Sequence, residues 1–216
     1  METFPASGCR FCHEGAKMVL FITGVCHRSC WYCPLSRERK GTDTVFANEH
    51  PVDIPAQIIE VAENMSALGT GITGGEPLLQ EDCLPLLEAL VERQFTVLLE
   101  TNGSRPLEAT DPRVHRIMDL KCPGSGMADH NYLANLEHLT SHDEVKLVIG
   151  DRSDFAWAVE LVRAHRLTER GPVLISPIFG VLPPAEAAAW IVASGLPLRL
   201  NLQLHKYIWG PEARGV

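Results

Sequence analysis

Three cysteines stand close together near the start of the chain, at Cys26, Cys30 and Cys33, with the spacing C-x3-C-x2-C. Thiolate ligands suit iron–sulfur clusters, so three of them can bind three irons of a 4Fe–4S cubane. The fourth iron then lacks a protein ligand. An open coordination site is what metal-based chemistry needs, as in catalytic zinc sites. The pattern therefore predicts a reactive 4Fe–4S cluster.

A zinc site is the alternative for the same loop. Zinc usually takes four protein ligands, and either His27 or the C-x2-C pair Cys9 and Cys12 could complete the set. Otherwise Cys9 and Cys12 are spare thiols or part of a local contact. The odd total of seven cysteines, with no secretion signal, argues against a disulfide framework. Cys83 and Cys122 are expected to be small buried hydrophobic residues.

Composition fits one ordinary domain. The 216 residues predict a single domain over 1–216, with residues 1–17 as an N-terminal extension that carries the C-x2-C pair. A formal net charge of −8 argues against nucleic-acid binding through the overall field. No apolar run is long enough to span a membrane, and no signal peptide is visible. The sequence thus predicts a cytoplasmic protein with no membrane partner.

Strand-like and helix-like segments alternate along the chain. This alternation predicts an α/β fold with a parallel sheet. The strands are too few for a full eight-stranded barrel, so an incomplete TIM-type barrel of about six parallel strands is expected. The expected strands are 18–23, 71–73, 95–101, 117–120, 144–149, 173–178 and 198–205. The expected helices are 54–68, 84–91, 132–139, 155–167 and 185–193.

A second motif, Thr73-Gly-Gly-Glu-Pro77, follows the short strand 71–73. Alone it is a simple turn. Together with the cysteine loop, it resembles the GGEP motif of radical S-adenosylmethionine (SAM) enzymes, where it lies along the SAM amino group. Gly74 and Gly75 would let the backbone approach closely. The resemblance implies a 4Fe–4S cluster with SAM on its open iron, and a 5′-deoxyadenosyl radical that abstracts hydrogen, so no protein residue is assigned as catalytic.

Other polar residues stand where strands end, at the edge of the sheet where α/β folds place their sites. With the GGEP residues they form the expected SAM-binding set. An ordinary strand-end turn is the alternative for the segment 100–102. Lys146, on another strand, is expected to pair with a bound anion, because an unpaired internal charge would be costly. The expected SAM-binding residues are Gly74, Gly75, Glu76, Glu100, Asn102, Asp119, Lys121, Ser125 and Ser176.

From Gly71 to Val216 the chain resembles 7-carboxy-7-deazaguanine synthases, the ring-contracting enzymes of queuosine and archaeosine precursor biosynthesis. The resemblance implies conversion of 6-carboxy-5,6,7,8-tetrahydropterin to 7-carboxy-7-deazaguanine, with loss of ammonia and regeneration of SAM. The matching strings keep their order and spacing. They are ITGGEPLLQ (72–80), LLETNGS (98–104), DLKCPGSGM (119–127), DEVKLVIGD (143–151), LISPIFG (174–180) and LQLHKYIW (202–209).

The first third departs from that family. Residues 9–50 resemble an uncharacterised archaeal radical SAM family related to glycyl-radical activating enzymes. Pro34 and Leu35 follow Cys33 where the synthases have Asp and Thr. That Thr helps to hold a magnesium ion against the substrate carboxylate. A magnesium ligand is therefore unassigned here, with Ser36 or Thr42 as replacement oxygen donors.

Gln203 and His205 alternate with leucines in the expected last strand, so both should share one face and line the cavity. The expected substrate-binding residues are Gly75, Gln203 and His205, with a structural role as the alternative for His205. Two other functions remain open: an activating enzyme that acts on a glycyl-radical or other protein partner, and a non-enzymatic zinc or iron–sulfur module. The family resemblance implies flavodoxin or ferredoxin as electron donor; a homodimer is one assembly to test.

Overall fold

The computed structural model describes residues 17–211 except 34, 36, 37, 49 and 54. Two compact units contain these residues. Of the described residues, the first unit comprises those within 17–27, 35–101 and 108–116, and the second comprises those within 28–33, 102–107 and 117–211. Cys9 and Cys12 lie outside the described residues, as does Ser36.

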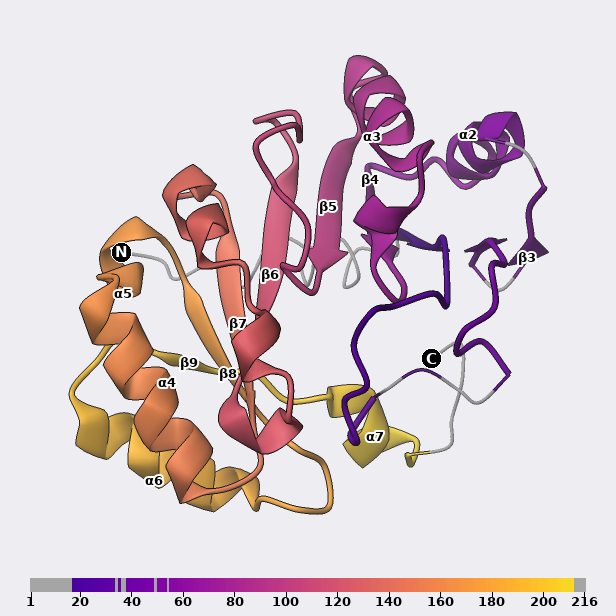
Figure 1. The fold of residues 1–216 in the computed structure, drawn as a ribbon. Coiled ribbons are helices and arrows are strands. Elements are labelled where there is room, and N and C mark those ends of the chain that lie inside the picture. Colours follow the sequence, from indigo (N-terminus) through magenta and orange to yellow (C-terminus); the bar gives the residue numbers. More distant parts are fainter. Residues whose placement is uncertain (1–16, 34, 36–37, 49, 54, 212–216) are drawn as a thin grey trace. The chain divides into compact units, whose positions relative to one another are not determined.

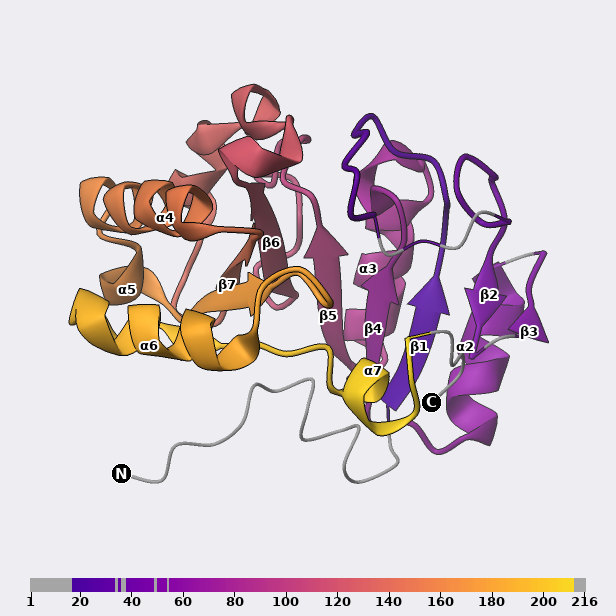
Figure 2. The same ribbon diagram turned by 90° about the horizontal axis from the view of Figure 1, so that it is seen from below.

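The sheet of the first unit is built around three parallel strands. β1 (Lys17–Phe21) pairs with β4 (Gly69–Thr73), and β4 pairs with β5 (Thr96–Thr101) (Figures 1 and 2; Figure 2 labels all three). Buried residues dominate β4 and β5. Near-continuous burial is typical of parallel strands, whose two faces are both covered. These strands confirm the sequence prediction, because each observed strand end lies within two residues of the predicted end.

Two short antiparallel strands, β2 (Phe46–Ala47) and β3 (His50–Pro51), extend this sheet on the far side of β1. The sequence prediction missed them, because two residues are too few to show a periodicity. The turn between them places Asn48 at a positive φ of 46°. Its side-chain oxygen accepts the amide N–H of Val19 at 2.7 Å. Asn tolerates this left-handed conformation better than most residues.

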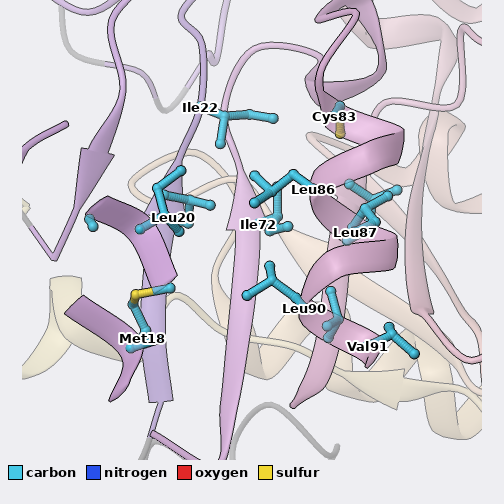
Figure 3. Close-up of a cluster of buried hydrophobic side chains, with 14 of the residues drawn as sticks. Met18, Leu20, Ile22, Ile72, Cys83, Leu86, Leu87, Leu90 and Val91 are labelled. Atoms are coloured by element: carbon cyan, nitrogen blue, oxygen red, sulfur yellow. The ribbon is translucent and has the colours of Figure 1, made fainter. Parts of the chain in front are cut away.

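The core of the first unit lies between its strands and the helices α2 (Pro55–Asn64) and α3 (Cys83–Glu92). Figure 3 shows residues of β1 and β4 facing the apolar side of α3. Burial raises the pKa of the Cys83 thiol to about 12, with the nearby Glu76 charge adding to the effect. Cys83 is thus the buried hydrophobic residue that the sequence predicted. The labelled side chains are Met18, Leu20, Ile22, Ile72, Cys83, Leu86, Leu87, Leu90 and Val91.

The second unit repeats the strand–helix alternation. Its parallel strands run in the order β6, β7, β8, β9 (Figure 1). The helix α4 packs on β7, and α6 packs on β8 and β9; Figure 2 labels both helices. Asp151 caps α4 by accepting the amide N–H of Asp154 at 2.9 Å. The strands are β6 (His115–Lys121), β7 (Glu144–Ile149), β8 (Val173–Pro177) and β9 (Arg199–Leu200), and the helices are α4 (Arg152–Ala164), α5 (Leu167–Arg170), α6 (Pro184–Ser194) and α7 (Leu204–Ile208).

Two expected elements are wrong. The last strand does not reach residue 205: β9 ends at Leu200, and the helix α7 follows, with Gln203 at its N-cap. Both β9 residues are exposed, so this edge strand buries no side chain that would favour a longer ladder. The expected helix 132–139 is the 3-10 helix η4 (Leu133–His138). The shorter 3-10 helices are η1 (Pro77–Leu79), η2 (Pro123–Ser125) and η3 (Ala128–His130).

No helix among the described residues is long and apolar enough to cross a membrane.

Candidate active site

The GGEP motif is joined to the start of the cysteine loop by backbone hydrogen bonds in the first unit. The N–H of Gly75 donates to the carbonyl of Thr23 at 2.6 Å, and the N–H of Glu76 donates to the carbonyl of Val25 at 3.0 Å. Cys26 is the next residue after Val25 and is half-buried. The motif therefore fixes the path of the chain into the first cysteine.

Both glycines are required by this close approach. A Cβ at Gly74 would lie 2.4 Å from the carbonyl oxygen of Thr23, and one at Gly75 would lie 2.1 Å from that of Val25. Real Cβ atoms essentially never come so close to backbone. Gly74 also has a φ of +151°, which side chains disfavour. As the sequence argument predicted, both positions need glycine for a close backbone approach. The group that they approach in the structure is the backbone at the start of the cysteine loop.

Glu76 points into the first unit. Its side chain is fully buried, and its carboxylate accepts the hydroxyl of Thr101 and the amide N–H of Leu78. These bonds fix the end of β5 to the motif that follows β4. Glu100, beside Thr101, is half-buried at the same strand end.

Cys30 and Cys33 lie in the second unit, on a tight turn. The N–H of Cys33 donates to the carbonyl of Cys30 at 3.2 Å. Cys30 is buried, Cys33 is half-buried, and neither they nor Cys26 form a disulfide. Three reduced thiols are the donor chemistry that an iron–sulfur cluster needs. Within neither unit do three or more described His, Cys, Asp or Glu side chains gather as a metal-binding group.

Arg28 and Trp31, in the same part of the cysteine loop, bind other segments of the second unit, and the sequence prediction missed both. The indole N–H of Trp31 donates to the carbonyl of Gly124 at 2.9 Å. The guanidinium of Arg28 donates to the carbonyls of Met127 and His130, each at 2.7 Å. The partners lie about a hundred residues further along the chain, so no local pattern could reveal the contacts.

A charged group links the neighbouring strands β6 and β7. Asp119 and Lys146 are register partners across the two strands. One carboxylate oxygen of Asp119 lies 3.0 Å from the ammonium of Lys121 and 3.6 Å from that of Lys146. Its other oxygen is buried and has no hydrogen-bond partner among the described residues. An orphaned acceptor of this kind suits a bound ligand that carries N–H or O–H groups.

Tyr32 and Cys122 border this charged group. The pKa of Tyr32 is raised, mainly by burial and then by the charge of Asp119. Lys121 lies 5.9 Å from the centre of the Tyr32 ring. Cys122 is fully buried, and burial raises the pKa of its thiol, with Asp154 adding to the effect. Both residues therefore stay neutral, and Cys122 is the hydrophobic residue that the sequence predicted.

Ser125, Ser176 and Asn102 are all buried in the second unit. The Ser125 hydroxyl donates to the carbonyl of Cys122 at 2.6 Å. The Ser176 hydroxyl accepts the side-chain amide of Asn201 at 2.9 Å. The side-chain oxygen of Asn102 accepts the N–H of Ser104 at 2.9 Å. Each hydroxyl or amide is held in one orientation at the end of a strand or in the loop that follows it.

Gln203 and His205 occupy the start of α7 and are half-buried. Their shared strand face, on which the substrate assignment was based, does not exist. Asn201, missed by the sequence prediction, directly follows β9 and bonds to Ser176.

Comparison with known proteins identifies the family. A model of the radical SAM superfamily matches residues 20–167. A 7-carboxy-7-deazaguanine synthase of Chlorobaculum tepidum is 38% identical over 200 residues, which cover 88% of this chain and 84% of that protein. The chain therefore belongs to the radical SAM superfamily and, within it, to the family of 7-carboxy-7-deazaguanine synthases.

Two further likenesses bear on the fold and on the first third. The crystal structure of QueE from Escherichia coli superposes with a TM-score of 0.61 at 18% identity, covering 87% of this chain and 84% of that one. With the superfamily match, this likeness confirms the predicted α/β fold class. A protein of Methanocaldococcus jannaschii named for glycyl-radical enzyme activation is 51% identical over 73 residues, 34% of this chain and 20% of its own length.

Proposed function

We propose that this protein is a radical SAM ring-contracting lyase. It converts 6-carboxy-5,6,7,8-tetrahydropterin to 7-carboxy-7-deazaguanine, with loss of ammonia, in the synthesis of 7-deazapurine precursors. The observation that carries the proposal is the 38% identity to a synthase of that name over 84% of its length. A match of this extent includes both units, so it is not a likeness of the cofactor motifs alone.

Cys26, Cys30 and Cys33 would hold the cluster, and the GGEP backbone and the ends of β5 and β6 would hold SAM. When bound, the reduced cluster and SAM supply the radical chemistry that the protein itself lacks. The protein contributes position. Gly75 fixes the loop before Cys26, and the Cys30–Cys33 turn exposes the last cysteine to a ligand. The orphaned oxygen of Asp119 is suited to accept a proton-bearing group of SAM.

The expected SAM contacts fall into two kinds. Glu76, Asn102 and Ser125 already hold neighbouring backbone or side-chain donors or acceptors. They would therefore shape the site, and their backbone groups would face the ligand. Asp119, Lys121 and Ser176, with the half-buried Glu100, carry the polar atoms that a ligand can engage directly.

Gln203 and His205 remain the proposed substrate contacts, together with the Gly75 backbone. Strand alternation no longer supports this assignment. What supports it is that both side chains are half-buried at the start of the short helix that follows the last strand. A pterin offers a planar edge of donors and acceptors, which an amide and an imidazole can match.

Magnesium would be a weak requirement for this enzyme. The side chain of Leu35 has no oxygen atom at the position where the synthases have Thr. Thr42, an alternative donor, uses its hydroxyl to bond the carbonyl of Arg39 at 2.8 Å. Any magnesium bound with the substrate would then rest on the substrate oxygens, water and a ligand such as Ser36.

We also propose the setting in which the enzyme works. The superfamily match over 20–167 includes parts of both units, which supports one radical SAM domain over 1–216. Flavodoxin or ferredoxin would supply the electron, the enzyme would work in the cytoplasm, and a homodimer is the proposed assembly.

An anaerobic assay tests the function. The reconstituted protein is incubated with SAM, reductant and 6-carboxy-5,6,7,8-tetrahydropterin, and the products are identified by mass. We expect 7-carboxy-7-deazaguanine and ammonia in equal amounts, with SAM regenerated. SAM cleavage without deazaguanine would reject this substrate.

The second candidate function is activation of a glycyl-radical or other protein partner. The 51% identity over 73 residues to the Methanocaldococcus jannaschii protein favours it, although the match covers only 20% of that protein. An activating enzyme would consume SAM stoichiometrically. The fate of SAM in the same assay therefore separates the two functions.

A further inference from the structure

Arg28 is a buried cation inside the cysteine loop, two residues before Cys30. Only 5% of its surface is exposed. Its guanidinium reaches three backbone carbonyls of the second unit: Met127 and His130 at 2.7 Å each, and Asn102 at 3.4 Å. A buried charge is tolerated only where hydrogen bonds satisfy it. These three carbonyls therefore stabilise the buried guanidinium of Arg28, and Arg28 in turn fixes the backbone segments that carry them.

Two of the three carbonyls bracket the 3-10 helix η3. Met127 is its N-cap, and His130 is its last residue. The two terminal nitrogens of one guanidinium bond the two ends of this turn, a geometry that a planar fork provides and a single ammonium does not. Arg28 thus joins the cysteine loop to the segment 127–130.

The next residue, Asn131, connects this segment to the end of β6. Its side-chain oxygen accepts the N–H of Lys121 at 3.0 Å, and its side-chain amide donates to the carbonyl of Lys121 at 2.9 Å. Lys121 in turn pairs with Asp119 at 3.0 Å. Hydrogen bonds, together with the peptide bond between His130 and Asn131 and the Lys121–Asp119 ion pair, therefore connect the loop that carries Cys30 to the charged group of the candidate SAM site.

We propose that Arg28 is a positioning residue that couples the cysteine loop to the SAM-binding end of β6. It acts through η3 and Asn131, and it touches neither cluster nor substrate. The role rests on the proposed function, because it assigns the cluster to Cys30 and the SAM contact to Lys121. It predicts that loosening Arg28 disturbs SAM binding even when all three cysteines are intact.

The test compares Arg28→Lys with a matched variant, Arg116→Lys. Arg116 is equally buried, at 4% exposed, but it lies at the start of β6, away from Lys121 at the other end of the strand, and donates to Thr110. Both substitutions keep the charge and remove the fork. The first readout is hydrogen exchange of the apoprotein. In Arg28→Lys we expect the amides of Lys121 and of residues 127–131 to exchange about tenfold faster, whereas Arg116→Lys leaves these amides unchanged.

The second readout uses reconstituted protein. We expect Arg28→Lys to keep its iron and sulfide but to raise the Kd for SAM about tenfold, with an altered electron paramagnetic resonance spectrum of the reduced, SAM-bound cluster. Wild-type exchange and SAM affinity in Arg28→Lys would overturn the proposal, as would identical changes in Arg116→Lys. Failure of the wild-type protein to bind SAM would instead overturn the proposed function. If Arg28→Lys does not fold, Arg28→Gln is measured in the same way.

Discussion

The hydroxyl of Thr101 donates to both carboxylate oxygens of Glu76, at 2.8 and 2.9 Å. Both residues are buried in the first unit, and the pair joins the end of β5 to the motif that follows β4. The acidic residue of the GGEP motif is therefore part of the framework of the site. Its position sets the Gly75 backbone, which in turn sets the entry into the cysteine loop.

Replacing Thr101 by Val should destabilise the first unit, because a buried carboxylate loses a donor while the shape of the side chain is kept. The expected loss in the free energy of unfolding is about 1–3 kcal/mol, measured by urea denaturation. Thr101→Ser keeps the hydroxyl and is the matched control. A loss in the Ser variant with no loss in the Val variant would show that the methyl group, rather than the hydrogen bond, matters.

Replacing Cys26, Cys30 or Cys33 by Ala should abolish SAM cleavage, because one iron of the cluster loses its thiolate. Iron and acid-labile sulfide analysis after anaerobic reconstitution measures the loss. Cys83→Ala is the control, since Cys83 is buried against the core of the first unit.

The double variant of Cys9 and Cys12 should keep the full cluster spectrum. Loss of about four irons and of all activity in that variant would contradict the ligand assignment, because the cluster would then depend on the C-x2-C pair.

Asp151 should contribute to stability in a pH-dependent way. The N–H of Asp154 and the hydroxyl of Ser153 lower the pKa of its carboxyl. A lowered pKa in the folded state means that the stabilisation is present above the unfolded pKa and is lost as the pH falls through the folded pKa. Asp151→Ala should therefore cost about 1 kcal/mol at neutral pH.

That cost should shrink below about pH 4, where the unfolded carboxyl becomes protonated. Asp151→Asn is the control, because Asn caps a helix but does not titrate. Urea unfolding at several pH values measures the effect; a cost of Asp151→Ala that stays constant down to pH 2 would assign the stabilisation to shape alone.

Magnesium dependence should be weaker than in synthases that keep the Asp-Thr sequence after the last cysteine. Turnover is measured with and without a chelator and across a magnesium titration. A strict, saturable requirement would contradict the inference from Leu35 and point to an oxygen ligand such as Ser36. Thr42→Ala then tests the other donor.

Sequence patterns predicted the regular part of this molecule well. β7 was predicted with its observed bounds, Glu144–Ile149. Its apolar residues alternate with polar ones and it is rich in β-branched residues, and both features are typical of a strand within a sheet. The two glycines were predicted because close backbone approach restricts those positions to one residue type. The cluster assignment of the three cysteines stays a prediction. The predicted last strand was too long because the sequence alternates through residue 205, whereas both residues of the observed strand β9 are exposed and no buried face extends the ladder.

Long-range contacts were not predictable. Arg28 donates to backbone carbonyls, which carry no sequence information. Asn131 accepts a hydrogen bond from the backbone of Lys121, ten residues earlier. Thr101 was visible only as part of a strand end, although it is the partner of Glu76. In each case the partner is a backbone group or a residue of another strand, so only the folded chain reveals the pairing.

Gln203 and His205 provide the test of the substrate assignment. Hydrogen-bonding sites discriminate strongly, because a wrong ligand leaves buried polar groups unpaired. We expect Gln203→Ala and His205→Ala each to slow formation of 7-carboxy-7-deazaguanine by about tenfold or more, equivalent to about 1.4 kcal/mol. The cluster should stay intact, and slow, uncoupled SAM cleavage should continue. Leu204→Ala is the matched control on the same helix, because Leu204 is 60% exposed. If all three variants slow the reaction equally, the helix α7 as a whole matters and the two polar side chains do not read the pterin.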